Sequence, residues 1–293
     1  MSLPSISIIG AGALGSALGR AVAAQQYPIK CIYNRTESKA QQLAERVGSD
    51  SWGSFPTSPD ELGSLVFLTV ADSAIAEAAA QLATLDGDVS GQTYVHCSGS
   101  ESAELLDPLR EKGARVASFH PLQTFTSQSK PADFSGIYFS LQGDANAFAQ
   151  LTDLAQSLGA QTLNVSAEEK SQLHGAAVFA SNYLLSLLDA AVEVGSGGGL
   201  ESQQVKQALL PLVQTSLQNA SDQSFEDALS GPIKRGDINT VKRHLKLLDD
   251  RVELKALYCM LGLRTLKVAE SAGGITGTDA EEMRIILDAG LDE

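Results

Sequence analysis

Short apolar runs alternate with amphipathic segments over the first 165 residues of the chain. The apolar runs have the length and the β-branched content of buried strands, and the segments between them have helical periodicity. Strands are predicted at Ser5–Ile9, Ile29–Tyr33, Leu65–Val70, Thr93–His96, Val116–His120, Ile137–Leu141 and Thr162–Val165. Helices are predicted at Ala13–Gln25, Ser38–Val47, Ser73–Ala83, Ser102–Arg110 and Ala145–Leu158. This alternation is typical of a doubly wound, mostly parallel sheet.

Beyond residue 165 the strand pattern stops and only helical patterns follow. A long first helix is predicted at Ala167–Val194, and the glycine-rich Gly195–Gly199 ends it. Further helices are predicted at Glu201–Asn219, Asp237–Leu248, Arg251–Ser271 and Asp279–Asp288, with Asp237 and Asp279 as N-caps. We interpret Gly195–Gly199 as a turn, because a phosphate loop needs a preceding strand and a following Lys-Ser/Thr pair. The prediction is an α/β domain over residues 1–165 and an all-α domain over 166–293.

Composition and charge narrow the class of protein. The 293 residues are 43% hydrophobic and 19% charged, as in ordinary globular proteins, and the net charge is −14. Both predicted domains are acidic, which argues against a nucleic acid or an anionic membrane as partner. Three widely spaced cysteines form no disulfide framework. We therefore predict a soluble cytoplasmic protein.

The longest segment without a charged residue is Ser171–Leu188. It contains His174, Ser181 and Asn182, and polar residues of this kind are costly in a bilayer. We interpret the segment as part of a buried helix and predict no membrane partner.

The first predicted turn has the spacing of a dinucleotide-binding loop. Gly10, Gly12 and Gly15 follow the first strand and open the first helix, with Ala13 and Leu14 between the last two glycines. Gly10 permits the tight turn, Gly12 lets the backbone approach a pyrophosphate, and Gly15 lets the helix pack on the strand. The helix N-terminus then offers free amides to the phosphates, so these five residues are candidate cofactor ligands.

The end of the second strand distinguishes between two cofactors. An NAD site usually places an acidic residue there to accept a hydrogen bond from the ribose 2′-hydroxyl. This chain has Asn34, followed by Arg35, Thr36 and Lys39, whose donors suit a 2′-phosphate. NADP(H) is the predicted cofactor, although the neighbouring Glu37 leaves open that Arg35 is simply solvated.

The end of the third strand offers another cofactor edge. Val70 and Ala71 lie where cofactor and substrate meet in open α/β sheets. Asp72 follows them, and it either caps the next helix or joins that edge.

Candidate chemistry follows at two more strand ends and on the long helix. Ser98, in the loop after Thr93–His96, could receive a carboxylate or an oxyanion together with nearby amides. His120 ends the next strand and could donate to a carbonyl near neutral pH. Lys170 and His174 are four residues apart and share a helix face. Each of these side chains also has a purely structural interpretation, such as a solvated first helical turn for Lys170.

The assembled sequence resembles a group of Rossmann-like NADP oxidoreductases whose helical C-terminal domain has no known function. The matching stretches are Ile8–Gly15, His96–Gly99, Ser118–Phe125, His174–Asn182, Leu229–Asp237 and Val241–Leu245. They span nearly the whole chain.

The architecture also resembles the 6-phosphogluconate dehydrogenase-like superfamily. Its 3-hydroxyacid dehydrogenases and ketopantoate reductases carry a catalytic lysine followed by an asparagine one turn later. Lys170 matches that lysine, while His174 stands in place of the asparagine. Similar relatives bury the long helix in a homodimer, which implies a homodimer here through Ala176–Leu188.

The resemblance implies an NADPH-dependent reductase of a small carbonyl or imine acid, with a ketopantoate-like substrate as one possibility. Lys170 would donate the proton, helped by His174 or His120, while Ser98 and Asn182 would orient the substrate. Two alternatives remain open. One is a non-catalytic NADP(H)-binding sensor, and the other is a flavin- or deazaflavin-linked NADP oxidoreductase, for which the sequence has no second cofactor motif.

Overall fold

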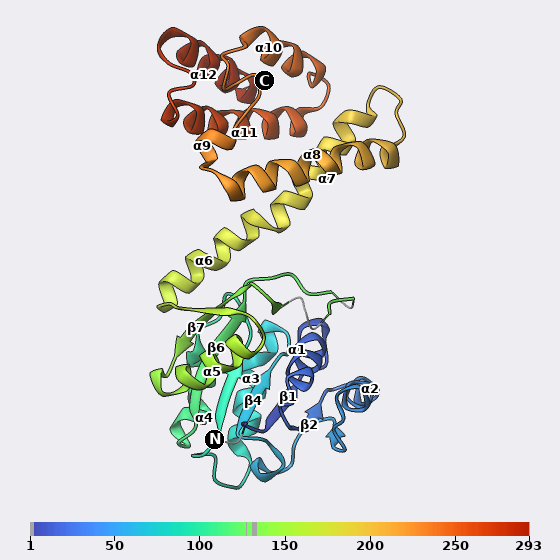
Figure 1. Cartoon of the computed structure of the whole chain (residues 1–293), viewed down its shortest axis with the longest axis vertical. Coiled ribbons are helices and arrows are strands. Elements are labelled where there is room, and N and C mark those ends of the chain that lie inside the picture. The colour runs from blue at the N-terminus through green and yellow to red at the C-terminus, as the bar shows by residue number, and fades with distance from the viewer. Residues whose placement is uncertain (1–2, 127, 131–133, 293) are drawn as a thin grey trace. The chain divides into compact units, whose positions relative to one another are not determined.

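The chain folds into two compact units, Met1–Tyr183 and Leu184–Glu293. The computed structural model describes residues 3–126, 128–130 and 134–292 (Figure 1). The predicted fold class, an α/β unit followed by helices, is confirmed.

A single eight-stranded sheet forms the centre of the first unit, in the order β3-β2-β1-β4-β5-β6-β7-β8. Its strands are β1 (Ile6–Ile9), β2 (Ile29–Tyr33), β3 (Trp52–Gly53), β4 (Leu65–Leu68), β5 (Thr93–His96), β6 (Arg115–Pro121), β7 (Tyr138–Gly143) and β8 (Gln161–Asn164). All neighbouring pairs are parallel except β6 and β7. The order reverses between β1 and β4, and ligands of open α/β sheets bind at the carboxyl ends of strands beside such a reversal.

Helices cover both faces of this sheet, as the alternation predicts. They are α1 (Ala13–Ala24), α2 (Glu37–Val47), α3 (Asp72–Thr84), α4 (Asp107–Glu111) and α5 (Ala145–Ser157), with short 3₁₀ turns η1 (Pro59–Glu61) and η2 (Ala103–Leu106). One buried apolar cluster packs α1, α2 and α5 against the sheet, and another packs α3 and α4. The helix predicted at Ser102–Arg110 is instead η2 followed by α4, since Pro108 cannot donate an amide to a continuous ladder.

The predicted long helix is present, with one interruption. It consists of α6 (Ala167–Ala180) and α7 (Asn182–Ser196), separated at Ser181, whose backbone leaves the helical region. A capping box starts it: Ser166 Oγ accepts from the Glu169 amide (3.2 Å), and the Glu169 carboxylate accepts from the Ser166 amide (2.7 Å).

The prediction that this helix is buried is wrong for the single chain. Phe179 is 73% exposed and Leu185 is 67% exposed. By length and composition alone, Ala167–Ser196 is apolar enough to cross a membrane. Its first turns nevertheless belong to the α/β unit, because the buried Lys170 side chain hydrogen-bonds there. The sequence pattern correctly predicted an apolar helix. It could not show whether the apolar side chains of this helix lie in a core or are exposed on the single chain.

The second unit is helical. It contains most of α7, then α8 (Ser202–Asp222), α9 (Phe225–Ala228), α10 (Ile238–Leu247), α11 (Val252–Ser271) and α12 (Gly277–Asp292). Figure 1 shows α10, α11 and α12 as neighbours, and their apolar residues form one core. Asp237 caps α10 by accepting from the Thr240 amide (3.0 Å), as predicted. Asp279 is not an N-cap, because α12 begins two residues earlier.

The glycine-rich segment is a turn between α7 and α8. Arg251 donates to the carbonyl of Glu193 (3.3 Å) at the end of α7, and a Cβ at Gly197 would lie 2.1 Å from the Arg251 guanidinium. The glycine therefore makes room for a helix-capping arginine. Strands give way to helices after Asn164, whereas the compact units divide at Tyr183, so the domain boundary at residue 165 stays a prediction.

Candidate active site

The glycine loop between β1 and α1 fits a dinucleotide. Gly10 has a φ of +116°, and a Cβ at Gly15 would lie 1.9 Å from the Gly10 carbonyl oxygen, so neither position admits a side chain. Nothing lies within 4 Å of the Cβ position of Gly12, where the backbone is open to a phosphate group. No side chain caps the first turn of α1, so its amides remain for an anion.

Asn34 connects this loop to the segment expected to read the cofactor ribose. Its Oδ1 accepts from the Ala11 amide (2.9 Å), and its Nδ2 donates to the Thr36 carbonyl (3.0 Å). Both ends of the amide are therefore engaged in holding the two loops together. Arg35 and Lys39 are exposed at the start of α2, where their cations are accessible to a 2′-phosphate.

The segment after β4, at the predicted cofactor edge, contacts both the glycine loop and the loop after β5. Thr69, after β4, donates its hydroxyl to the Gly10 carbonyl (2.6 Å). Ala71 is the N-cap of α3 without a side-chain cap, and Asp72 is the first residue of the helix. Asp72 therefore does not cap α3. Its carboxylate instead accepts from Ser100 Oγ (3.4 Å) in the loop after β5.

Lys170 is a buried cation bound to that same loop. Its side chain comes from the first turn of α6 and is 2% exposed. Its Nζ donates to the carbonyls of Ser98 and Glu101, both at 2.6 Å. Burial lowers the pKa of Lys170 to about 8, and the negative charges of Asp72 and Glu101 oppose this shift. The ammonium is thus a protonated group in a nearly dry position at neutral pH.

The loop itself is held by internal hydrogen bonds. Ser98 Oγ accepts from the amides of Ser100 (3.3 Å) and Glu101 (3.2 Å), and the Ser98 amide donates to His96 Nδ1 (3.2 Å). The predicted anion-receiving donors of this loop are therefore used within it. Burial also raises the pKa of Cys97 to about 12, which makes its thiol unreactive.

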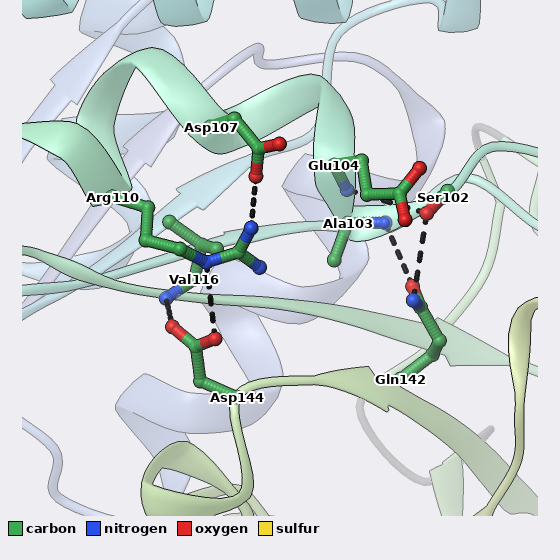
Figure 2. A network of polar contacts seen from close by, with 8 residues as sticks. All are labelled: Ser102, Ala103, Glu104, Asp107, Arg110, Val116, Gln142 and Asp144. Atoms are coloured by element: carbon green, nitrogen blue, oxygen red, sulfur yellow. Dashed lines mark hydrogen bonds and ion pairs between the residues drawn. The ribbon is translucent and has the colours of Figure 1, made fainter.

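A second network fixes the segment that follows the loop, as Figure 2 shows. Gln142, on β7, accepts from the Ala103 amide (2.7 Å) and donates to Ser102 Oγ (3.4 Å). Asp144 accepts from Arg110 Nε (3.1 Å) and from the Val116 amide (2.8 Å), and Figure 2 shows Arg110 also paired with Asp107. The segment from Ser102 to Arg110, which follows the loop, is therefore held to β6 and β7.

Two imidazoles meet above this loop. The rings of His120, on β6, and His174, on α6, stand edge to face with centroids 6.0 Å apart. A Cβ at Gly99 would lie 2.4 Å from His174 Nδ1 and 2.8 Å from His120 Nε2. Burial first, and then the positive charge of Lys170, lowers the pKa of His120 to about 4. His174 Nδ1 is buried and has no hydrogen-bond partner among the residues that the structure describes.

The structure thus brings together four of the five predicted catalytic residues: Lys170, His174, His120 and Ser98. Asn182 begins α7, after the break, and accepts from Ser181 Oγ (3.2 Å). Its role toward a substrate stays a prediction.

Sequence reasoning did not select His96 as a site residue. It is fully buried, and its Nε2 has no partner within residues 3–126, 128–130 and 134–292. Burial and the positive charge of Lys170 lower its pKa to about 4. Its position at a strand end beside the loop was the available signal.

Two family models match the chain. A Rossmann-like domain matches residues 2–121, and a domain of unknown function, DUF2520, matches residues 137–265. A search of curated proteins found no match.

Solved structures share the fold over nearly the whole chain. A Bacteroides fragilis protein, provisionally assigned as an NADP oxidoreductase, is 26% identical with a TM-score of 0.71, and the match covers 92% of this chain and 98% of that one. A Thermotoga maritima protein is 25% identical with a TM-score of 0.72, covering 91% and 98% of the two chains. A 1-pyrroline-5-carboxylate reductase from Streptococcus pyogenes, at 17% identity and a TM-score of 0.61, covers 93% and 99% and shares the fold. The chain thus combines a segment similar to a Rossmann-like domain with a following segment similar to DUF2520.

Proposed function

We propose that this chain is an NADP-dependent reductase of a small carbonyl or imine acid. The observation that carries the proposal is a continuous set of contacts from the glycine loop to a buried lysine. Thr69 contacts Gly10, Asp72 contacts Ser100, and Lys170 holds the loop that contains Ser100. A protonated lysine and two histidines thus lie at the strand ends where the cofactor and substrate of an open α/β sheet meet.

Gly10, Gly12 and Gly15 fit a pyrophosphate, with Ala13 and Leu14 supplying the first amides of α1. Arg35, Thr36 and Lys39 would receive the 2′-phosphate, on loops that Asn34 holds together. Val70 and Ala71 would border the nicotinamide side. The Bacteroides fragilis structure, assigned to an NADP oxidoreductase, supports the same cofactor. Bound NADPH would supply the hydride.

The chain's own residues would handle the proton and the substrate. Lys170 is protonated at neutral pH and would be the proton donor. The imidazoles of His120 and His174, which pack against each other, would assist it. The substrate class follows from the sequence resemblance and stays part of the proposal. Ketopantoate is its first candidate because Lys170 matches the lysine of ketopantoate reductases.

The test is NADPH consumption by the purified protein against 2-oxo acids, 3-oxo acids and cyclic imino acids, with ketopantoate included. We expect turnover on at least one class, with a drop of at least a hundredfold in Lys170→Met. Tight NADPH binding without turnover on any class would favour the sensor alternative.

We also propose that the exposed side of the long helix is covered by a second copy of the chain. Its uncovered apolar side chains include Phe179, Tyr183 and Leu185, and the rings of Phe179 and Tyr183 pack edge to face (5.1 Å). The helical unit adds an apolar cavity of about 590 Å³ that Leu187, Leu257 and other side chains line. Large exposed apolar side chains of this kind mark an interface in soluble proteins. The cytoplasmic location stays a prediction.

A further inference from the structure

We propose that His120 Nε2 and His174 Nδ1 form a two-imidazole clamp that binds the reacting oxygen or nitrogen atom of the substrate, and that Lys170 positions the loop beneath this clamp. The inference rests on the proposed reductase function and assigns roles within its site.

The clamp is defined by two ring nitrogens that converge on Gly99, whose missing side chain lets them approach each other. A Cβ there would lie 2.4 Å from His174 Nδ1 and 2.8 Å from His120 Nε2, so the two nitrogens are about 5 Å apart at most. One ligand atom that approaches the pair from the side away from Gly99 can hydrogen-bond to both, because such bonds span about 2.7–3.2 Å. His174 Nδ1 is buried and has no partner in the described part of the chain, which is costly unless a ligand satisfies it.

Lys170 fixes the position of the loop that contains Gly99. Two of its three N–H donors are committed to the carbonyls of Ser98 and Glu101 at 2.6 Å. These bonds bracket Gly99 in sequence and hold the peptide on which both imidazoles converge. Removing the ammonium would leave the carbonyl oxygens of Ser98 and Glu101 without this donor. The loop beneath the two imidazoles would then lose its fixed position.

The His120 imidazole would act as a neutral hydrogen-bonding group. The groups that face His120 are Lys170, His174, His96 and Asp72. Burial, Lys170, His174 and His96 lower its pKa to about 4, while Asp72 opposes this shift. A neutral imidazole carries one N–H and can donate to a carbonyl oxygen as negative charge develops there. Hydrogen bonding of this kind polarises the C=O or C=N bond toward hydride addition.

Gly99→Ala tests the clamp directly. Gly99 has no left-handed φ, so alanine fits the backbone, but its methyl group would clash with both ring nitrogens and push the two imidazoles apart. The matched control is Gly91→Ala in the turn before β5, where nothing lies within 4 Å of the Cβ position. The assay measures kcat/KM with the best acid from the panel, the Kd for NADPH by fluorescence, and Tm.

We expect Gly99→Ala to lose at least about a hundredfold in kcat/KM, the usual effect of removing a transition-state donor. Its Kd for NADPH should stay within about twofold of wild type, and Gly91→Ala should match wild type in every measurement. Equal kcat/KM in Gly99→Ala and wild type would overturn the clamp and leave the reductase standing. A parallel loss of NADPH binding would also overturn it. No turnover by wild type would overturn the reductase proposal and the clamp with it.

Amide substitutions provide a second measurement that does not depend on packing at Gly99. His120→Gln and His174→Asn place an amide donor near Nε2 and Nδ1 respectively, whereas His120→Phe and His174→Phe remove the donor. We expect the amide variants to keep kcat/KM within about tenfold of wild type and the phenylalanine variants to lose a hundredfold. Amide variants as inactive as the phenylalanine variants would overturn the clamp, since a proton-transfer role would then be required.

Discussion

Single side chains in the α/β unit carry the cofactor preference and the pH behaviour of the candidate site. Asn34 makes one hydrogen bond within the protein at each end of its amide, so we do not expect it to be the main side chain that distinguishes the two cofactors. It instead holds the loop from which Arg35 and Lys39 extend. The preference for NADP over NAD is therefore expected to depend on the two cations.

Arg35→Ala should weaken NADPH binding by at least tenfold, because a charge-assisted contact to the 2′-phosphate is lost. NADH binding should change by less than about twofold, since NADH lacks that phosphate. Fluorescence titration with both cofactors measures the two Kd values, and Arg46→Ala, near the end of α2, is the control. Equal weakening for NADPH and NADH would contradict a 2′-phosphate contact.

Two buried histidines predict loss of stability in acid. Burial holds the pKa values of His96 and His120 near 4, below their usual 6.5. The unfolded chain therefore binds protons that the folded chain resists, and stability present above pH 6.5 is lost as the pH falls toward 4. Urea unfolding at pH 7 and pH 5 should give a smaller difference for His120→Gln than for wild type. The same difference in both proteins would contradict the depressed pKa of His120.

At the scale of elements, the first turn of the long helix positions Lys170 in the candidate active site. Ser166 and Glu169 form the capping box immediately before Lys170. The helical pattern predicted this start at Ala167, and the Ser-x-x-Glu spacing at Ser166 and Glu169 is a second signal for it in the sequence. The break at Ser181 had no clear sequence signal.

Ser166→Ala should lower the stability of the folded state by about 1 kcal/mol, the typical cost of losing an N-cap. For a unit of this size that corresponds to a Tm lower by roughly 2–4 °C. The control is Ser171→Ala on the exposed side of the same helix. Equal Tm values for the two variants would show that the capping box contributes nothing measurable.

The sequence predicted elements best where periodicity and burial agree. The strands Ile29–Tyr33 and Thr93–His96 are found at the expected bounds, the first buried over its last three residues and the second throughout. The two-residue β3 at Trp52–Gly53 is too short to leave a pattern. Site residues at strand ends were predictable because parallel strands share an edge, as His120 illustrates. The hydrogen bonds of Lys170 to backbone carbonyls were not, because they depend on a loop 69 to 72 residues away in sequence.

At the scale of the whole molecule, the uncovered apolar helix is the feature that a single chain leaves unexplained. A bilayer and a second copy would both cover Phe179 and Leu185. The position of Lys170 in the α/β unit favours the second copy, because a membrane span would have to begin next to a buried, charged side chain.

Leu185→Glu should convert a dimer to a monomer, because it places a charge in the proposed interface. Light scattering after size exclusion measures the mass of each protein. Leu163→Glu is the control, as this exposed leucine lies on β8 and not on the helix. A monomeric wild type that floats with phospholipid vesicles would contradict the dimer and support a membrane role.

The central claim is hydride transfer from NADPH to a small carbonyl or imine acid, and deuterium labelling tests it most directly. Purified protein is mixed with NADPH carrying deuterium at the 4R or the 4S position and with the acid panel, and the products are analysed by mass spectrometry. The account predicts a hydroxy or amino acid that carries one deuterium from one of the two labels only. NADPH that stays bound and keeps its label with every acid would contradict the reductase assignment.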